Sequence, residues 1–199
     1  MTKKYALLTV SDKTGIVAFA RALKRLGFEL VGSLKTAQLL QKNNIPVTEV
    51  SKITKYPAIM GKQGIKLIHP KIFAAILADK NDKGHLAECK KYKINPFDIV
   101  ICNFYPFEKT IAGKGFSHAQ ALFNLDIGGP AMVRCAAKNY QNVAVIVDVK
   151  DYADVLRELG AAGSVSLQTR KRLSFKAFSY AHKYDEAIIA YLRKAFHEK

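Results

Sequence analysis

The sequence contains little cysteine. Its three cysteines, Cys89, Cys102 and Cys135, form no Cys-x-x-Cys pair and no other spacing typical of a zinc site. An odd number in a chain of 199 residues also argues against a disulfide framework and favours a reducing compartment. The cysteines therefore predict neither a zinc site nor a disulfide scaffold.

Long apolar runs are also missing. No stretch approaches the ~20 apolar residues that a membrane span requires. The N-terminal Met1-Thr2-Lys3-Lys4 is followed by an apolar run that ends before Ser11 and is too short for a signal peptide. We expect a soluble, cytoplasmic protein with no membrane partner.

Acidic residues are scarce relative to basic ones. The chain has 16 Asp and Glu against 32 Lys and Arg, which gives a formal net charge of +16. Such an excess attracts anions, including phosphorylated molecules and nucleic acids. The basic residues are scattered, however, without the interleaved aromatics of a single-strand binder. We interpret most of them as solvated surface and expect no specific nucleic-acid partner, although binding driven by charge alone stays open.

Low-complexity segments, linkers and internal repeats are absent, so we expect a single domain over residues 1–199. Short apolar runs alternate with amphipathic segments, as strands and helices do in α/β proteins. The predicted strands are 5–10, 28–31, 47–50, 99–102 and 143–147, and the predicted helices include 16–26, ended by Gly27, 36–42 and one that begins near Gly129. The loop from Lys52 to Pro70 is expected to be irregular.

This alternation predicts a three-layer α/β fold, in which helices flank a mainly parallel central sheet joined by right-handed crossovers. The core is expected over about 1–150 and a helical part over about 151–199. In that tail, apolar residues keep a helical period from Leu173 to Leu192. We expect two helices, or one broken helix, packed on the sheet, and assign no chemistry to them.

The segment Asp126 to Lys138 is the most informative. Asp126 precedes Gly128-Gly129-Pro130, which mark the start of a helix. The free N–H groups and positive end of such a helix suit an anionic or oxygen-rich ligand. Lys138 lies about three turns further along and would reach this point only through neighbouring elements. The alternative is a capped helix with a lone acid.

Polar clusters also follow the predicted strands, where ligands bind in open parallel sheets. Ser11-Asp12-Lys13-Thr14-Gly15 and Gly32-Ser33-Leu34-Lys35-Thr36 could grip one phosphate from both sides; the first is not a Walker A loop, and N-capping is its alternative. Asn103-Phe104-Tyr105 offers an amide and a phenol, or forms an aromatic core corner. For His69, we favour a histidine held by packing or a backbone hydrogen bond. Together the clusters outline a pocket for a phosphorylated molecule with a polar ring.

These residues carry a resemblance. The motifs that carry it are Val10-Ser11-Asp12-Lys13-Thr14-Gly15, Lys66…His69-Pro70, Asn103-Phe104-Tyr105-Pro106-Phe107, Asp126-Ile127-Gly128-Gly129, Ala136-Ala137-Lys138-Asn139 and Lys176-Ala177-Phe178…Tyr184-Asp185-Glu186-Ala187-Ile188. Over essentially its whole length the chain resembles the IMP cyclohydrolase domain that precedes a larger AICAR transformylase domain in bifunctional purine biosynthesis proteins. The resemblance implies the methylglyoxal-synthase-like α/β fold.

It also implies a reaction, in which 5-formamidoimidazole-4-carboxamide ribotide closes to IMP and loses water, the last step of de novo purine biosynthesis. That makes the protein a cyclohydrolase acting in the ring-closing sense, with no metal or organic cofactor. The implied catalytic residues are Lys66, Tyr105, Asp126 and Lys138, and the implied substrate-binding residues are Ser11, Lys13, Thr14, Ser33, Thr36, Asn103, Gly128 and Gly129. The expected partner is a small phosphoribosyl substrate; a separate AICAR transformylase and a homodimer stay open.

The chain departs from the family pattern in two places. Leu34 and Lys35 stand where the family usually has two glycines in its second phosphate loop, and Leu67 stands where it usually has a threonine. An arginine before Lys66 is also lost, with Lys62 a substitute from a shifted position. We expect these changes to weaken the grip on phosphate, unless Lys35 compensates. They favour the alternative of a diverged phosphoribosyl-binding or regulatory module without efficient ring closure.

Overall fold

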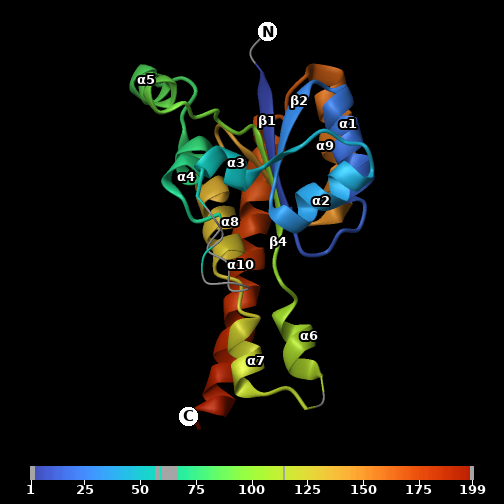
Figure 1. Ribbon diagram of the computed structural model, residues 1–199, viewed down its shortest axis with the longest axis vertical. Coiled ribbons are helices and arrows are strands. Elements are labelled where there is room, and N and C mark those ends of the chain that lie inside the picture. Colours follow the sequence, from blue (N-terminus) through green and yellow to red (C-terminus); the bar gives the residue numbers. More distant parts are fainter. Residues whose placement is uncertain (1–2, 57–58, 60–66, 114, 198–199) are drawn as a thin grey trace.

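The structure, a computed structural model, describes residues 3–56, 59, 67–113 and 115–197 (Figure 1). Within these residues the centre of the fold is a five-stranded sheet with the order β3-β2-β1-β4-β5, in which every neighbouring pair is parallel. The strands are β1 (Lys4–Val10), β2 (Phe28–Gly32), β3 (Thr48–Glu49), β4 (Ile99–Asn103) and β5 (Ala144–Ile146). The predicted parallel sheet is confirmed.

Helices connect and cover the strands. They are α1 (Ile16–Arg25), α2 (Leu34–Lys42), α3 (Val50–Thr54), α4 (Pro70–Leu77), α5 (Lys83–Tyr92), α6 (Phe107–Ala112), α7 (His118–Phe123), α8 (Gly128–Lys138), α9 (Tyr152–Ala162) and α10 (Leu167–Ala195), with the short 3₁₀ helix η2 (Val149–Asp151) before α9. The beginning of the loop that was expected to be irregular is therefore the helix α3.

The helices form a layer on each side of the sheet, which confirms the three-layer prediction. The buried apolar residues divide into two clusters: one joins the sheet to α1, α2 and α9, and the other joins it to α4, α8 and α10. Figure 1 shows these two groups on opposite sides of β1 and β4. Right-handed crossovers give this division, because the chain moves from β1 to β2 in one direction and from β4 to β5 in the other.

The strand β1 is buried on both faces. Leu7 belongs to one apolar cluster, whereas Ala6 and Leu8 belong to the other, and all three side chains are fully buried. A strand in this position needs apolar residues at successive positions and not in alternation. This requirement explains why the sequence reads Ala-Leu-Leu there.

The C-terminal tail is one continuous helix. Of the two alternatives, two helices or one broken helix, neither holds, because α10 runs without interruption for 29 residues. It packs against α8 and β5 and then extends past the sheet towards α6 and α7 (Figure 1). Although α10 is long, no helix in the described part of the chain has an apolar stretch sufficient to cross a bilayer.

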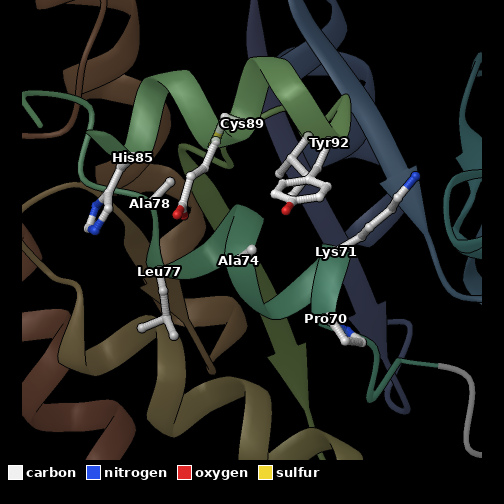
Figure 2. Close-up of a pocket in the computed structure, with 10 residues that line it drawn as sticks. Pro70, Lys71, Ala74, Leu77, Ala78, His85, Cys89 and Tyr92 are labelled. Atoms are coloured by element: carbon white, nitrogen blue, oxygen red, sulfur yellow. The ribbon is translucent and has the colours of Figure 1, made fainter. Parts of the chain in front are cut away.

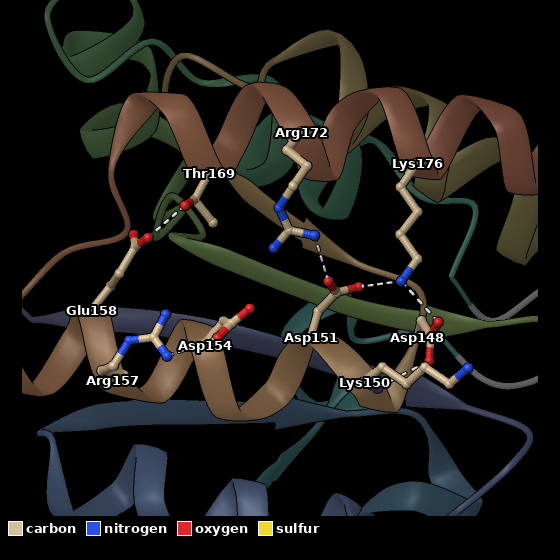
Figure 3. Close-up of polar contacts among 9 residues, drawn as sticks. All are labelled: Asp148, Lys150, Asp151, Asp154, Arg157, Glu158, Thr169, Arg172 and Lys176. Carbon is tan, nitrogen blue, oxygen red and sulfur yellow. Dashed lines mark hydrogen bonds and ion pairs between the residues drawn. The ribbon is translucent and has the colours of Figure 1, made fainter.

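An ion-pair network fastens α10 to the segment after β5 (Figure 3). Lys176 lies 2.8 Å from Asp148 and 2.7 Å from Asp151, and Arg172 lies 2.7 Å from the second oxygen of Asp151. One helical turn earlier, the hydroxyl of Thr169 donates to Glu158. These contacts hold the first half of α10 against η2 and α9.

Candidate functional site

The predicted site residues that the structure describes gather mainly at the carboxyl ends of β1, β2 and β4. Because β1 connects to β2 on one side and pairs with β4 on the other, this edge is the switch point at which open parallel sheets bind ligands. The side-chain amide of Asn103, the last residue of β4, spans the gap to the loop after β1. Its Oδ1 accepts from the N–H groups of Ser11 at 2.6 Å and Asp12 at 2.9 Å, and its Nδ2 donates to the Asp12 carbonyl at 3.0 Å.

These bonds change the interpretation of Asn103. The sequence suggests a side chain that meets the base of the ligand. In the structure the amide oxygen and one amide N–H are already used by the loop. Asn103 therefore holds the Ser11–Gly15 loop in place. Among the described residues its second amide N–H has no partner, and the predicted contact with the base would use this donor.

The two predicted phosphate loops meet directly. The ammonium of Lys13 donates to the hydroxyl of Thr36 at 2.8 Å and also to the Val10 carbonyl, and the Ser33 hydroxyl lies 3.2 Å from Thr36 Oγ1. Thr36 is fully buried. Burial and the nearby charge of Lys35 lower the pKa of Lys13 below its ordinary value. A cation in that environment gains from an added anion.

The loop after β1 does not cap α1. Asp12 accepts bonds from the N–H and the hydroxyl of Thr14, at 2.9 and 2.6 Å, which closes a tight turn. The position before α1 is Gly15 at φ 69°, where a left-handed backbone favours glycine. The N-cap alternative for Ser11 and Asp12 is therefore wrong.

The second loop is the start of a helix. α2 begins at Leu34, so its first three N–H groups, those of Leu34, Lys35 and Thr36, have no partner within the helix. The side chain of Ser33 does not cap them. Leu34 and Lys35 are helical residues, and positive φ angles are found at other positions. The chain therefore does not need the two glycines to present N–H groups at this point.

Asp126 lies in the turn before α8 with its carboxylate held from two sides. Oδ1 accepts from Gly129 N–H at 2.8 Å, and Oδ2 accepts from Tyr105 N–H at 3.4 Å. Burial raises the pKa of this carboxyl above its usual value, and the two backbone hydrogen bonds offset part of that rise. A carboxyl with raised proton affinity beside a ligand edge is suited to acid–base chemistry.

The two glycines at the start of α8 have different roles. A Cβ atom at Gly129 would lie 2.7 Å from the Asp126 carboxylate and 2.9 Å from the Phe104 ring, so this position is occupied by the protein itself. At Gly128 the nearest side-chain atom would be 4.0 Å away, on Ile68. Of the two predicted ligand contacts, Gly128 alone leaves room for a ligand among the residues that the structure describes.

The remaining predicted catalytic residues are not all brought together. Tyr105 follows β4 beside Asp126, and its side chain is 48% exposed. Lys66 lies outside the described residues. Lys138 is exposed at the opposite end of the 11-residue helix α8, ~15 Å from its start at 1.5 Å per residue. Within one chain, Lys138 therefore does not meet Asp126.

Two residues that contact this site were not predicted as site residues from the sequence. The hydroxyls of Tyr180 and Tyr184 on α10 accept hydrogen bonds from the N–H groups of Phe104, at 3.1 Å, and Asp126, at 2.9 Å. Both tyrosines lie on the face that the periodicity predicts to be buried. A buried phenol needs a polar partner, and that requirement was the signal in the sequence.

A separate hollow lies between α4 and α5 (Figure 2). It measures about 440 Å³ and is lined by residues such as Ala74, Leu77, Cys89 and Tyr92. None of the predicted site residues that the structure describes lines it. His69, at the start of α4, accepts from Lys71 N–H through Nδ1 at 3.1 Å, which confirms that it is held by a backbone hydrogen bond.

The fold and the site define a class of protein. The profile of the MGS-like domain matches residues 15–131, and the chain belongs to that family. A second profile, described as the AICARFT/IMPCHase bienzyme, matches residues 136–199. The first match therefore runs from just before α1 to the start of α8 and includes β2, β3 and β4, and the second runs from the end of α8 through β5, α9 and α10.

Particular relatives are more informative. The chain is 46% identical to the bifunctional purine biosynthesis protein PurH of Persephonella marina, over 96% of this chain and 37% of that protein. It is 42% identical to PurH of Bacillus subtilis, over 100% of this chain and 39% of that protein. The chain thus spans less than two fifths of these relatives. A crystal structure of ForH matches with a TM-score of 0.80 and 31% identity, over 94% of this chain and 98% of that one.

Proposed function

We propose that the protein is an IMP cyclohydrolase, which closes 5-formamidoimidazole-4-carboxamide ribotide to IMP with loss of water. Two findings together support the proposal. The relatives at 42–46% identity are purine biosynthesis proteins, and most of the described residues that resemble cyclohydrolase site residues lie at the carboxyl ends of β1, β2 and β4, with Lys138 as an exception. The expected substrate is a small phosphoribosyl molecule.

The phosphate of this substrate would bind where the two loops meet. Lys13 supplies an ammonium, Ser11, Thr14 and Ser33 supply hydroxyls, and the start of α2 supplies free N–H groups. The buried hydroxyl of Thr36 accepts a hydrogen bond from the ammonium of Lys13 and so orients it. Lys35, exposed in the first turn of α2, adds a second cation near Lys13.

Ring closure forms a bond between the carboxamide nitrogen and the formyl carbon, and breaks the bond between that carbon and the formyl oxygen. The oxygen leaves as water with one proton from the carboxamide nitrogen and one from the formamide nitrogen. We propose that Asp126 accepts the first proton and returns it to the leaving oxygen; the rise of its pKa by burial supports this role. Because the amide is a poor nucleophile, holding both arms in reacting geometry supplies much of the acceleration.

The remaining groups would bind the reacting oxygen and the ring. Tyr105, beside Asp126, is proposed to donate to the formyl oxygen together with Lys66. Gly128, where a Cβ atom would meet no described side-chain atom closer than 4.0 Å, is proposed to face the base. We assign no role to Lys138 in the site of its own chain.

A second candidate is a phosphoribosyl-binding module that does not close the ring. Leu34 and Lys35 favour it, since they replace the family glycines at the phosphate loop. The retained Tyr105 and Asp126 pair opposes it. For both candidate functions we propose a cytoplasmic protein. The partners that we propose to test are a separate AICAR transformylase and a second copy of this chain.

A direct ring-closure assay separates the two candidates. IMP formation from the formylated ribotide is followed for the parent and for Asp126→Asn, which keeps the size of the side chain and removes its proton transfer. We expect turnover by the parent and a loss on the order of 10²-fold in kcat for the variant. Binding of IMP without turnover by the parent would establish the binding module. Absence of both would refute the assignment of the site.

A further inference from the structure

Two tyrosines on α10 are joined to the main chain of the candidate site. Tyr180 and Tyr184 are one helical turn apart, and their hydroxyls accept from Phe104 N–H at 3.1 Å and Asp126 N–H at 2.9 Å. Phe104 immediately precedes Tyr105. One hydroxyl therefore holds the turn that carries Tyr105, and the other holds the turn that carries Asp126. These two turns contact each other at the Asp126 carboxylate.

The rings of these tyrosines are locked by packing. The Phe104 ring stacks on Tyr180 with centroids 4.4 Å apart and meets Tyr184 edge-on at 5.0 Å. Burial raises the pKa of both phenols, that of Tyr184 to about 12, so both hydroxyls stay neutral near pH 7. Rings that cannot move give their hydroxyls a fixed position.

A closed circuit of contacts results. Tyr180 holds Phe104, Tyr105 N–H donates to the Asp126 carboxylate, and Tyr184 holds the Asp126 N–H. The turn of α10 from Tyr180 to Tyr184 thus spans the distance between the turn after β4 and the turn before α8. A change of an ångström in this distance would break the 3.4 Å contact between Tyr105 N–H and the carboxylate.

We propose that Tyr180 and Tyr184 are positioning residues, which set the place of the Asp126 carboxyl relative to Tyr105 and keep it half-buried. The expected effect on kcat rests on the proposed cyclohydrolase function, whereas the expected effect on the pKa of Asp126 does not. The hydroxyls touch no substrate atom in this proposal, so they act through Asp126. The part of the chain outside the MGS-like match thereby supplies the support for a residue inside it.

Loss of a hydroxyl should expose the carboxyl. Among the described residues, the titratable groups that face Asp126 are Cys102 on β4 and Tyr180 and Tyr184 on α10. None of them supplies a positive charge. Burial is therefore the main cause of the raised pKa of Asp126. Water entering a loosened turn would lower this pKa, and the fall should exceed the rise caused by losing the Tyr105 hydrogen bond, because burial is the largest cause of the shift.

The test uses Tyr184→Phe and Tyr180→Phe, each of which keeps the ring and removes the hydroxyl. The matched control is Tyr191→Phe on the same helix, whose hydroxyl bonds His118 Nδ1 at 2.8 Å. We measure kcat and KM for ring closure, and we titrate the Asp126 carboxyl carbon by NMR. We expect kcat to fall about tenfold in each site variant with KM within about twofold, because the phosphate contacts are untouched. The pKa of Asp126 should fall towards 3.8, and the control should match the parent.

The two readouts separate this proposal from the proposed function. If the parent forms no IMP, the function is wrong and the NMR titration alone decides the positioning role. An unchanged pKa of Asp126 in both folded site variants would overturn the proposal, as would equal changes in the control. A rise in KM without a fall in kcat would also overturn it, since it would place the tyrosines in substrate binding.

Discussion

The ammonium of Lys176 lies 2.7 Å from Oδ2 of Asp151, whose side chain is only 5% exposed. The same ammonium lies 2.8 Å from Asp148, two residues after β5. Val149, which lies between these two carboxylates in the sequence, packs next to Gly15 in the loop after β1. A Cβ atom added at Gly15 would lie 3.1 Å from the Val149 side chain. This ion pair therefore supports the loop after β1 as well as the attachment of α10.

We predict that Lys176→Met destabilises the protein by about 1–3 kcal/mol, because it removes charged partners from two carboxylates of which one is buried. Arg172 still pairs with Asp151, which limits the loss. Urea unfolding measures the effect. Lys171→Met, at an exposed position of the same helix, is the control and should unfold as the parent does. Equal midpoints for the two variants would show that the network adds nothing.

The same network predicts a pH dependence. The hydrogen bond from Lys176 lowers the pKa of Asp148 below its usual 3.8. A carboxyl with a lowered folded-state pKa contributes stability above the unfolded value, and this contribution is lost as the pH falls through the folded value. Between pH 5 and pH 2, the difference in unfolding free energy between the parent and Lys176→Met should therefore shrink. A constant difference over this range would contradict the assignment.

For Asn103 we predict a binding effect. Asn103→Ala removes three hydrogen bonds that hold the loop carrying Ser11 and Lys13, and the loop then pays ordering entropy when a ligand binds. Calorimetry should show IMP binding weakened by about tenfold, which corresponds to ~1.4 kcal/mol. Asn43→Ala, which removes a remote bond to Leu39, should bind as the parent does. Loss of binding in the control as well would point to a general loss of folding.

The structure changes our expectation for the second phosphate loop. From sequence, glycines at 34 and 35 should improve the grip on phosphate. Both residues are helical, however, and the charge of Lys35 reaches Lys13. We now predict that Leu34→Gly/Lys35→Gly binds IMP more weakly, since it removes a cation and loosens the first turn of α2. Stabilisation by IMP against heating, compared with inosine as the ligand that lacks phosphate, reports the effect for each protein. Tighter binding by the variant would restore the first expectation.

Local patterns predicted the strands well because four of the five are short, mostly apolar runs between turn residues, the exception being the two-residue β3. β1 and β4 are buried on both faces, so their composition alone identifies them. The single helix α10 was harder to predict because half of it leaves the sheet, and its exposed face carries large apolar residues such as Phe175, at 77% exposure. That mixture weakens a helical period.

The site was predictable only where chemistry is local. Ser11, Lys13 and Asp126 follow strands or precede helices, and these positions can be read from the chain. Contacts such as that of Tyr184 with Asp126 join residues 58 positions apart, and no spacing rule reveals them. For Lys138 the local spacing was informative, since a position about three turns beyond Asp126 lies at the far end of α8.

The central position of β1 has a consequence for synthesis of the chain. β1 pairs on one edge with β2, which follows soon, and on the other with β4, where Thr9 meets Cys102. At ~5–20 residues per second, a ribosome needs roughly 4–14 s to make the intervening segment between β2 and the end of β4. During that time a strand without its second neighbour offers unpaired N–H and C=O groups to other chains. The carboxyl ends of β1, β2 and β4, where the candidate site lies, therefore come together only after β4 has been made, and until then the free side of β1 is exposed to mispairing.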